Sequence, residues 1–551
     1  MHTSTHLPRW RRAAVPLASA LVVGLGLLAG SPGTATGAVP GAGCASPDHP
    51  GGAWPSLNGD LANSRSQPAE RVIGPQQAAA LRPAWSFSGA AVGAPGGMRS
   101  TPVVAHGCVY IALGEGYLGT RGDVIALNAD TGALVWHRRI EGSVLGLTVD
   151  HGLVYAAVSQ GSRSNAPVVT EETIATGTSA IAMDAASGKL RWASVRLDDG
   201  DADNGTFINA TPVAFTAGER ELLFVALSGG GGDGARVPMY FLDARSGHVV
   251  RKAYSLTEAE YAMGFGGTGI WSTAAYDPAT QHLYVGTADS DGHSRQHPYN
   301  NAILKVDAHP RRSSFGTVVA AYQGVSEHAD LDGIIGYPNN PVCGASGEML
   351  SVDPPTFVDT SASAECLELD FDFGASPNLF VDGRDGRLKV AALQKSGVVH
   401  VAYADTMAGD WRRFVGTAGP FMNGATSAVD RSHLYVPATP NLVFKLHRDT
   451  GDVAWVSSTE LGMFSYGPIT HANGVTYAVN DAGFLVASDA ATGAVLSRSL
   501  IAAAGQAGEC LGVGSGVAVA RNTVYAPCNG GGASDLAGLP GDPGGIVAYR
   551  P

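Results

Sequence analysis

Charged side chains are scarce in this sequence of 551 residues. They make up 15% of it, against about 25% in an average globular chain, and lysine occurs six times. Glycine occurs 74 times, about twice its usual ~7% share. Long solvated helices with ladders of ion pairs are therefore not expected, whereas many short strands joined by tight turns are. With 45% hydrophobic residues, the chain can form a large buried core.

Several ligand and cofactor motifs are missing. No C-x-x-C-H pattern occurs, which excludes a covalently attached c-type haem. The glycine run at 229–232 is followed by neither a Lys-Ser/Thr pair nor a helical pattern, so it does not predict a phosphate-binding loop. The formal charge is −13, and such an anionic surface argues against nucleic acid or acidic lipid as the main partner.

The N-terminus has the pattern of a secretory signal over residues 1–38. Arg9, Arg11 and Arg12 precede an apolar stretch at 13–30, and small residues follow, with cleavage expected after Ala35 or Ala38. A membrane anchor is the alternative, but this Ala- and Gly-rich stretch is short for a span. No later segment is long and apolar enough to cross a bilayer. We therefore expect a secreted, extracellular protein with no membrane span after cleavage.

Six cysteines in an exported chain predict up to three disulfides. Sequence separation favours Cys343–Cys366 and Cys510–Cys528, which leaves Cys44–Cys108, although fifteen pairings are possible.

One pattern recurs along the chain. Each copy begins with a strand that ends in an apolar residue followed by tyrosine. A second strand follows and ends in a five-residue turn. The last residue of this turn is glycine, and the first is mostly Asp or Asn. The apolar-Tyr pairs end at Tyr110, Tyr155, Tyr284, Tyr435 and Tyr525, with weaker copies at Phe224, Val390 and Tyr477. The turns end at Gly132, Gly188, Gly247, Gly409, Gly451 and Gly493. In such turns the Asp or Asn side chain caps the backbone and glycine adopts a positive φ.

Tryptophan and small residues keep the same register. Trp136, Trp192 and Trp455 each lie four residues after a turn glycine, and Trp411 lies two after. Segments rich in small residues precede the apolar-Tyr strands and suit the crowded centre of a radial array; examples are 100–104, 210–213, 374–377 and 467–469. A β-sandwich is the alternative. However, eight units with a period of roughly 42–48 residues match a propeller with four strands to a blade.

We therefore predict an all-β fold, an eight-bladed β-propeller of four-stranded antiparallel blades over 81–551. It follows an N-terminal extension at 39–80 and has an insertion at 324–368 between the fourth and fifth units. The last unit ends at 545–549 without a fourth strand, whereas 83–87 offers a strand with a spare Trp85. We expect that N-terminal strand to be the outer strand of the last blade, where it satisfies the open edge.

Residues 54–63 and 81–85 resemble the opening of the quinoprotein alcohol dehydrogenases, in particular the polyvinyl-alcohol-dehydrogenase-like branch. These are eight-bladed propellers that hold pyrroloquinoline quinone (PQQ) and a calcium ion on the axis. The resemblance spans nearly the whole chain after the signal. It implies an oxidoreductase that oxidises a small or polymeric alcohol with PQQ and passes electrons to a separate acceptor, such as a cytochrome c.

The resemblance also assigns site residues. Trp271 matches the tryptophan under the quinone, and Asp289, eighteen residues later, matches an Asn that binds the metal. A rigid aromatic face suits a flat quinone, and a carboxylate keeps an oxygen ligand for a hard cation. Packing within a blade is the alternative for Trp271.

Residues 369–379 resemble the family segment with two aspartates before an inner strand. On that match Asp372 is the catalytic base, and Asp370 is an extra metal ligand of lanthanide-dependent members. Lys395, 23 residues after Asp372, matches the cation that binds the quinone oxygen and stabilises the developing anion. An ordinary half-exposed strand and a solvated loop lysine are the alternatives.

Glu172, twelve residues before Asp184, matches the metal-binding Glu of the polyvinyl-alcohol branch. The Cys-Cys pair that follows it in that branch is Thr173-Ile174 here. Together with Asp289 in place of Asn, this departure favours the second class of function that we consider, a non-catalytic propeller that serves as a protein- or ligand-binding scaffold.

Overall fold

The computed structural model describes the parts of the chain given by the following residue numbers: 44, 49–94, 96–98, 100–114, 119–159, 168–170, 173–175, 177–198, 206–229, 236–289, 297–325, 347–352, 355–359, 371–416, 423–439, 441–458, 467–480, 482–502, 516–529 and 543–551. They belong to one compact unit, residues 42–551. Structural statements below concern these residues.

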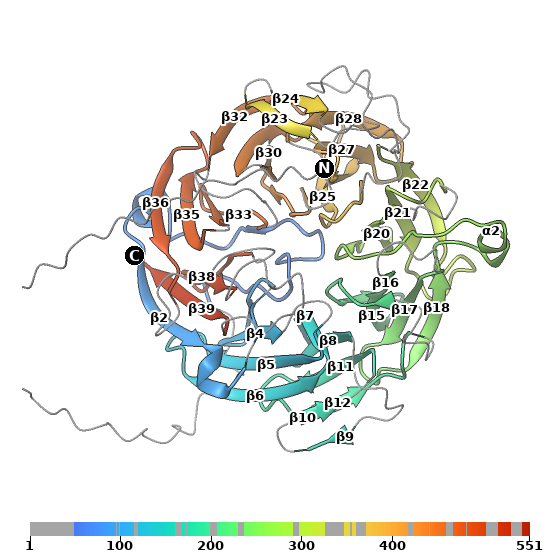
Figure 1. Cartoon of the computed structure of the whole chain (residues 1–551), viewed down its shortest axis with the longest axis horizontal. Helices are drawn as coiled ribbons and strands as arrows, with labels where there is room; N and C mark the ends of the chain where they lie inside the picture. Colours follow the sequence, from blue (N-terminus) through green and yellow to red (C-terminus); the bar gives the residue numbers. More distant parts are fainter. Residues whose placement is uncertain are drawn as a thin grey trace, which may run out of the picture. The chain divides into compact units, whose positions relative to one another are not determined.

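Eight antiparallel blades form a closed wheel, as the repeat predicts (Figure 1). From the inner to the outer strand, blades 1 to 4 are as follows. Blade 1 is β3 (Val103–Ala105), β4 (Cys108–Gly114), β5 (Arg121–Asn128) and β6 (Leu134–Glu141). Blade 2 is β7 (Ser143–Asp150), β8 (Leu153–Ser159), β11 (Ser179–Asp184) and β12 (Leu190–Ala193). Blade 3 is β14 (Val213–Ala217), β15 (Arg220–Ala226), β17 (Pro238–Asp243) and β18 (Val249–Tyr254). Blade 4 is β19 (Ala275–Asp277), β20 (His282–Gly286), β21 (Ala302–Asp307) and β22 (Val318–Gln323).

Blades 5 to 8 complete the wheel in the same order. Blade 5 is β25 (Asn378–Val381), β26 (Leu388–Leu393), β27 (Val398–Tyr403) and β28 (Gly409–Phe414). Blade 6 is β29 (Ala428–Val429), β30 (His433–Ala438), β31 (Leu442–His447) and β32 (Val453–Ser458). Blade 7 is β33 (Thr470–Ala472), β34 (Val475–Val479), β35 (Phe484–Asp489) and β36 (Val495–Leu500). Blade 8 is β37 (Ala518–Ala520), β38 (Thr523–Cys528), β39 (Gly545–Arg550) and β2 (Arg82–Ser88). Several inner strands begin a few residues later than the small-residue segments named from the sequence.

Shorter elements decorate the wheel. Strands β10 (Thr173–Ala175) and β9 (Val168–Val169) extend blade 1, and β1 (Ser66–Gln67) joins the inner edge of blade 7. Two-stranded sheets form from β13 (Thr206–Phe207) with β16 (Ser228–Gly229), and from β23 (Gly347–Val352) with β24 (Pro355–Asp359) inside the predicted insertion. The helices of the described residues are α1 (Pro75–Ala78), the 3₁₀-helix η1 (Gly89–Val92) and α2 (Glu258–Ala262). None of them is long and apolar enough to span a bilayer.

The predicted ring closure is confirmed. β2 pairs antiparallel with β39, so a strand near the N-terminus completes blade 8. The Trp85 indole lies against Gly132 of blade 1, where an added Cβ would come within 2.5 Å of the ring. Its Nε1–H donates to Ala129 O. The same contact joins other neighbouring blades, through Trp136 on Gly188, Trp192 on Gly247, Trp411 on Gly451 and Trp455 on Gly493.

The core lies between blades. Each hydrophobic cluster combines residues of two neighbours; Tyr110 of blade 1 and Val154 of blade 2, for example, share one cluster. The predicted disulfide Cys44–Cys108 is present, with a Cα–Cα distance of 5.2 Å. Cys528 is also disulfide-bonded, whereas Cys510, Cys343 and Cys366 lie outside the described residues.

The N-terminal extension crosses the centre of the wheel along the inner strands (Figure 1). Its backbone pairs with blade 1, at Trp54 and Val104, and its carbonyls accept hydrogen bonds from blades 2, 8 and 4 to 7. Arg65 lies fully buried within this segment. Its guanidinium donates to backbone carbonyls of Leu57, Ile469 and Val517, and to side-chain oxygens of three further residues. No carboxylate lies within ion-pair distance of it in the described residues, so backbone dipoles hold the buried charge.

Candidate functional site

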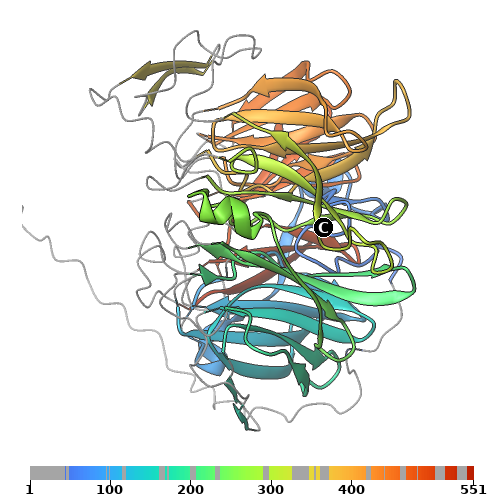
Figure 2. The same cartoon turned by 90° about the vertical axis from the view of Figure 1, so that its right-hand side faces the viewer.

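Four of the residues singled out from the sequence meet at one end of blades 4 and 5. Trp271 precedes the inner strand β19, and Asp372 precedes the inner strand β25. Asp289 follows β20, and Lys395 lies in the connection between β26 and β27. In an antiparallel blade, the entry to the first strand and the connection between the second and third strands lie at the same end. This is also the end of the wheel at which α2 lies (Figure 2).

The Asp372 carboxylate is the meeting point of this group, and its residue is 7% exposed. Trp271 Nε1–H donates to Asp372 Oδ2 at 2.8 Å. Lys395 Nζ lies 3.3 Å from the same oxygen, and the backbone N–H of Asp289 donates to Oδ1 at 2.7 Å. Asp372 thus accepts hydrogen bonds from an indole, a lysine and a backbone amide, and a charged donor makes such a bond shorter and stronger. These contacts fix the position of its carboxylate beside the Trp271 indole.

Trp271 presents a partly exposed indole beside these charges. Lys395 Nζ lies 5.0 Å from the ring centroid, a distance at which the cation is attracted to the π face. Gly374 lies against the benzene edge of the indole, because an added Cβ would come within 1.8 Å of Cη2. The indole is thus fixed at one edge by a glycine and at its Nε1 by Asp372. An aromatic face with a cation and a carboxylate at its margin suits a flat, anionic quinone.

Buried polar groups fix the loop that carries Lys395. Gln394 exchanges two hydrogen bonds with the backbone of Val325, and its Oε1 also accepts from His400 Nε2 at 2.9 Å. On the other side of the imidazole, Tyr322 OH donates to Nδ1. Burial lowers the pKa of His400 to about 3, so the ring is neutral and bridges two elements. Sequence reasoning missed this network; a histidine within the apolar strand 398–403 is the signal that could have shown it.

A second network supports Asp289. Asn300 Nδ2–H donates to the backbone carbonyl of Asp289, while its Oδ1 accepts from the backbone N–H of His297. His297 Nε2 lies 3.1 Å from Glu260 Oε1 on α2. His297 therefore contacts a carboxylate of the helix. Asn300 holds the backbone of Asp289, whose amide donates to Asp372.

The metal site is not assembled within the described residues. They contain no group of three His, Cys, Asp or Glu side chains placed to hold a metal ion. Glu172 and Asp370, both named as metal ligands from the sequence, lie outside the described residues. Asp289 contacts the site through its backbone N–H. Metal binding by Asp289, Glu172 and Asp370 stays a prediction.

Comparisons with known proteins agree with this fold. Residues 79–263 and 395–544 match the PQQ_2 family, described as outer membrane protein assembly factor BamB. A polyvinylalcohol dehydrogenase of Sphingopyxis sp. (strain 113P3) is 26% identical over 372 residues, 61% of this chain. The match spans half the length of that relative.

Solved structures show the same fold. A europium-containing methanol dehydrogenase aligns with a TM-score of 0.64 and 15% identity, covering 91% of this chain and 98% of that one. A quinohemoprotein alcohol dehydrogenase from Comamonas testosteroni aligns with a TM-score of 0.62 and 16% identity, covering 90% and 80%. At these identities the likeness concerns the fold.

Proposed function

We propose, from the premise that this chain belongs to the PQQ_2 family of repeat propellers, that it is a quinoprotein oxidoreductase that oxidises an alcohol. The observation that carries the proposal is the convergence of Trp271, Lys395 and Asp372, which come from separate connections of two blades. A family likeness in fold would not by itself require these side chains to touch.

Each residue has a distinct task in this proposal. The Trp271 face, pinned beside Gly374, would hold PQQ flat, and Lys395 Nζ would donate to a quinone oxygen. The quinone, when bound, supplies the acceptor for the hydride of the alcohol. The Asp372 carboxylate would accept the hydroxyl proton of the alcohol, and Lys395 and the Asp289 amide hold that carboxylate in place. The alcohol would thus give its hydroxyl proton to Asp372 and, with a bound cofactor to accept the hydride, would become a carbonyl compound.

Calcium or a lanthanide belongs to the proposal as a Lewis acid beside the quinone. Asp289, Glu172 and Asp370 are its proposed ligands, on the resemblance in sequence. Because no covalent haem motif is present, a separate carrier such as a cytochrome c would receive the electrons. A small or polymeric alcohol is the proposed substrate.

Export to an oxidising compartment is the proposed location. Disulfides persist in secreted proteins and are rare in the cytosol, and the disulfide Cys44–Cys108 begins within a few residues of the expected signal cleavage site. Secretion of a tagged full-length chain, with N-terminal sequencing of the mature product, tests this proposal.

Reconstitution tests the activity. The purified protein is incubated with PQQ and Ca²⁺ and desalted, and then assayed for retained quinone absorbance and alcohol-dependent dye reduction. Asp372→Asn should keep the quinone and lose at least about 100-fold in turnover, because it removes the base while retaining an acceptor for Trp271. Asp130→Asn, an exposed carboxylate in a turn of blade 1, is the matched control and should stay active.

Two outcomes oppose the proposal. Full activity of Asp372→Asn would remove Asp372 from the role of base. If the wild-type protein retains no quinone and reduces no dye, the non-catalytic scaffold becomes the better assignment.

A further inference from the structure

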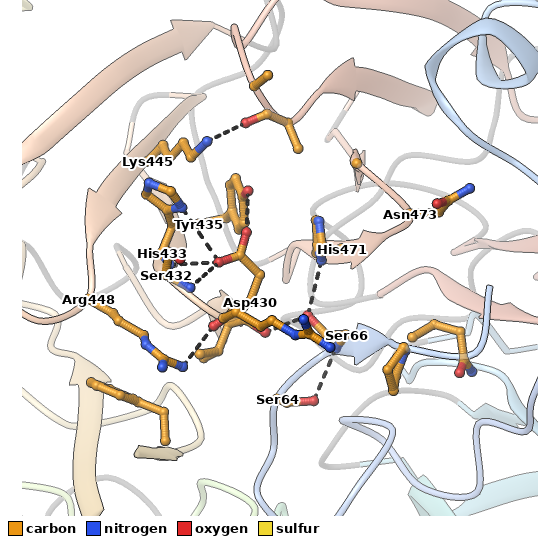
Figure 3. A pocket seen from close by; sticks show the side chains of 18 of the residues that line it. Ser64, Ser66, Asp430, Ser432, His433, Tyr435, Lys445, Arg448, His471 and Asn473 are labelled. Carbon is orange, nitrogen blue, oxygen red and sulfur yellow. Dashed lines mark hydrogen bonds and ion pairs between the residues drawn. The ribbon is translucent and has the colours of Figure 1, made fainter. Parts of the chain in front are cut away.

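A cavity lies at the other end of the blades from the candidate site. It has a volume of about 710 Å³ and is lined by blades 5 to 7 and by the N-terminal segment 64–71 (Figure 3). Its walls come from the connection between the first two strands of blade 6, at Asp430, and from that of blade 7, at Asn473. Connections of this kind lie at the opposite blade end from the one that carries Lys395. The cavity is therefore separate from the candidate active site.

The lining of this cavity is positively charged. Arg71, Arg431, Lys445 and Arg448 line it, against one carboxylate, Asp430. The chain as a whole carries a formal charge of −13, so a local excess of three positive charges contrasts with the rest of the molecule. Field lines concentrate in a cleft lined by one sign of charge and raise the local concentration of the opposite ion.

The Asp430 carboxylate is hydrogen-bonded within its own turn and forms no ion pair with the arginine side chains of the lining in the described residues. Oδ1 accepts from the backbone N–H groups of Ser432 and His433, and Oδ2 accepts from Tyr435 OH. Burial opposes ionisation, but these hydrogen bonds prevail and lower the pKa of Asp430. The hydrogen bonds of the carboxylate thus hold the turn at Asp430 in place.

Arg448 is preorganised. Its side chain is 14% exposed, and its guanidinium lies 5.2 Å from the Phe380 ring centroid. NH1 donates to the Asp430 carbonyl and NH2 to the Val381 carbonyl, and Nε lies 3.6 Å from Asp449 Oδ1, an ion pair that offsets part of its charge. Each terminal nitrogen of an arginine carries two hydrogens, so one hydrogen on each is left beyond these bonds. A guanidinium held in this way loses little side-chain entropy when it binds an anion.

Arg431 supplies an exposed cation at the rim. In the described part of the chain it makes no hydrogen bond or ion pair, and Arg71 donates only to the neighbouring carbonyl of Glu70. Figure 3 shows Asp430 of blade 6 and His471 of blade 7 in the lining, with Ser66 Oγ beside His471 Nδ1. Two exposed cations at the rim and one less exposed guanidinium that is held in place match a ligand with several negative charges.

We propose that this cavity binds a multivalent anion that carries phosphate or carboxylate groups. Guanidinium groups form charge-assisted, often bidentate, hydrogen bonds with both. The cavity is large enough for several such groups, and Arg448 would bind one of them while Arg431 and Arg71 bind others. This proposal does not depend on the proposed oxidation.

Calorimetric titration tests it, with inorganic pyrophosphate and citrate as separate probes of the phosphate and carboxylate forms. At low ionic strength we expect saturable 1:1 binding of at least one probe, which weakens as salt is added. Arg431→Gln and Arg71→Gln should each weaken it about fivefold, which is the upper range for an exposed ion pair. The control is Arg220→Gln, an exposed arginine at the start of β15 in blade 3, which removes the same charge and should leave affinity unchanged.

Preference for pyrophosphate or for citrate identifies the form of the ligand. Absence of saturable binding of both probes overturns the proposal. So does equal weakening by Arg220→Gln, since binding would then reflect overall charge.

Discussion

Replacing Gly374 with alanine should displace the Trp271 indole from Asp372. The new Cβ would lie 1.8 Å from Cη2 and 2.3 Å from Cζ2 of the indole. Carbon atoms in contact are about 3.5 Å apart, so the ring edge must move by about 1.7 Å. The backbone of residue 374 has little freedom to move instead, because Phe373 N–H donates to Thr287 O just before it.

A movement of this size breaks the hydrogen bond between Trp271 Nε1 and Asp372 Oδ2, which is 2.8 Å long and is lost beyond about 3.5 Å. Overpacking of this kind typically costs about 1–3 kcal/mol of folding free energy. The blades should therefore stay folded while the aromatic face tilts. If PQQ lies on that face, its dissociation constant should rise at least about tenfold, equivalent to ~1.4 kcal/mol.

Two assays follow the change. Retained quinone absorbance after desalting and a PQQ titration give the affinity, and thermal unfolding gives the stability. Gly229→Ala is the matched control, because its Cβ would meet nothing closer than Val237 Cγ2 at 3.7 Å. Unchanged PQQ affinity in Gly374→Ala, or equal loss in Gly229→Ala, would refute the role of the indole as the platform.

Two further predictions concern stability. Arg65→Lys keeps the buried charge, but lysine has three donors, whereas Arg65 makes six hydrogen bonds. We expect the free energy of unfolding, measured in urea, to fall by about 3 kcal/mol. A fall below about 1 kcal/mol would contradict the structure. The Asp382 carboxylate accepts a hydrogen bond from Arg384, and its Oδ2 lies 3.2 Å from Nζ of the buried Lys389. The hydrogen bond from Arg384 is the main cause that lowers the pKa of Asp382. Because the folded-state pKa is lowered, the contact stabilises the fold above the unfolded pKa of about 3.9, and this stabilisation is lost as pH falls further. Asp382→Asn should therefore be less stable than wild type at pH 7, and the gap should narrow below about pH 4; a gap that is constant with pH would contradict this reasoning.

The repeat made much of the fold predictable from sequence. Turns that end in glycine, and tryptophans in register with them, are local features, so the number of blades follows from counting. Trp85 was identified because the last unit lacked its outer strand, and it docks on Gly132 as its counterparts dock on theirs. Five pairs of neighbouring blades repeat this contact between a tryptophan and a turn glycine, so one local pattern predicts those interfaces.

The candidate site was predictable only where residues matched a familiar spacing. Trp271, Asp372 and Lys395 were named from sequence and lie in contact. The hydrogen bond from the Asp289 backbone amide to Asp372 was not predicted, nor was the hydrogen bond from His400 to Gln394 beside Lys395. A main-chain donor and a buried imidazole leave little signal in the sequence.

The sequence alone thus determined the architecture, because short-range turn chemistry and blade-to-blade packing repeat along the chain. Tertiary structure alone decided what lies at the centre and at the two ends of the wheel. The extension that crosses the ring, the carboxylate with its three donors and the cationic cavity each join segments far apart in sequence. These contacts are made by side chains and backbone groups that lie far apart in the sequence, and a local sequence pattern does not record them.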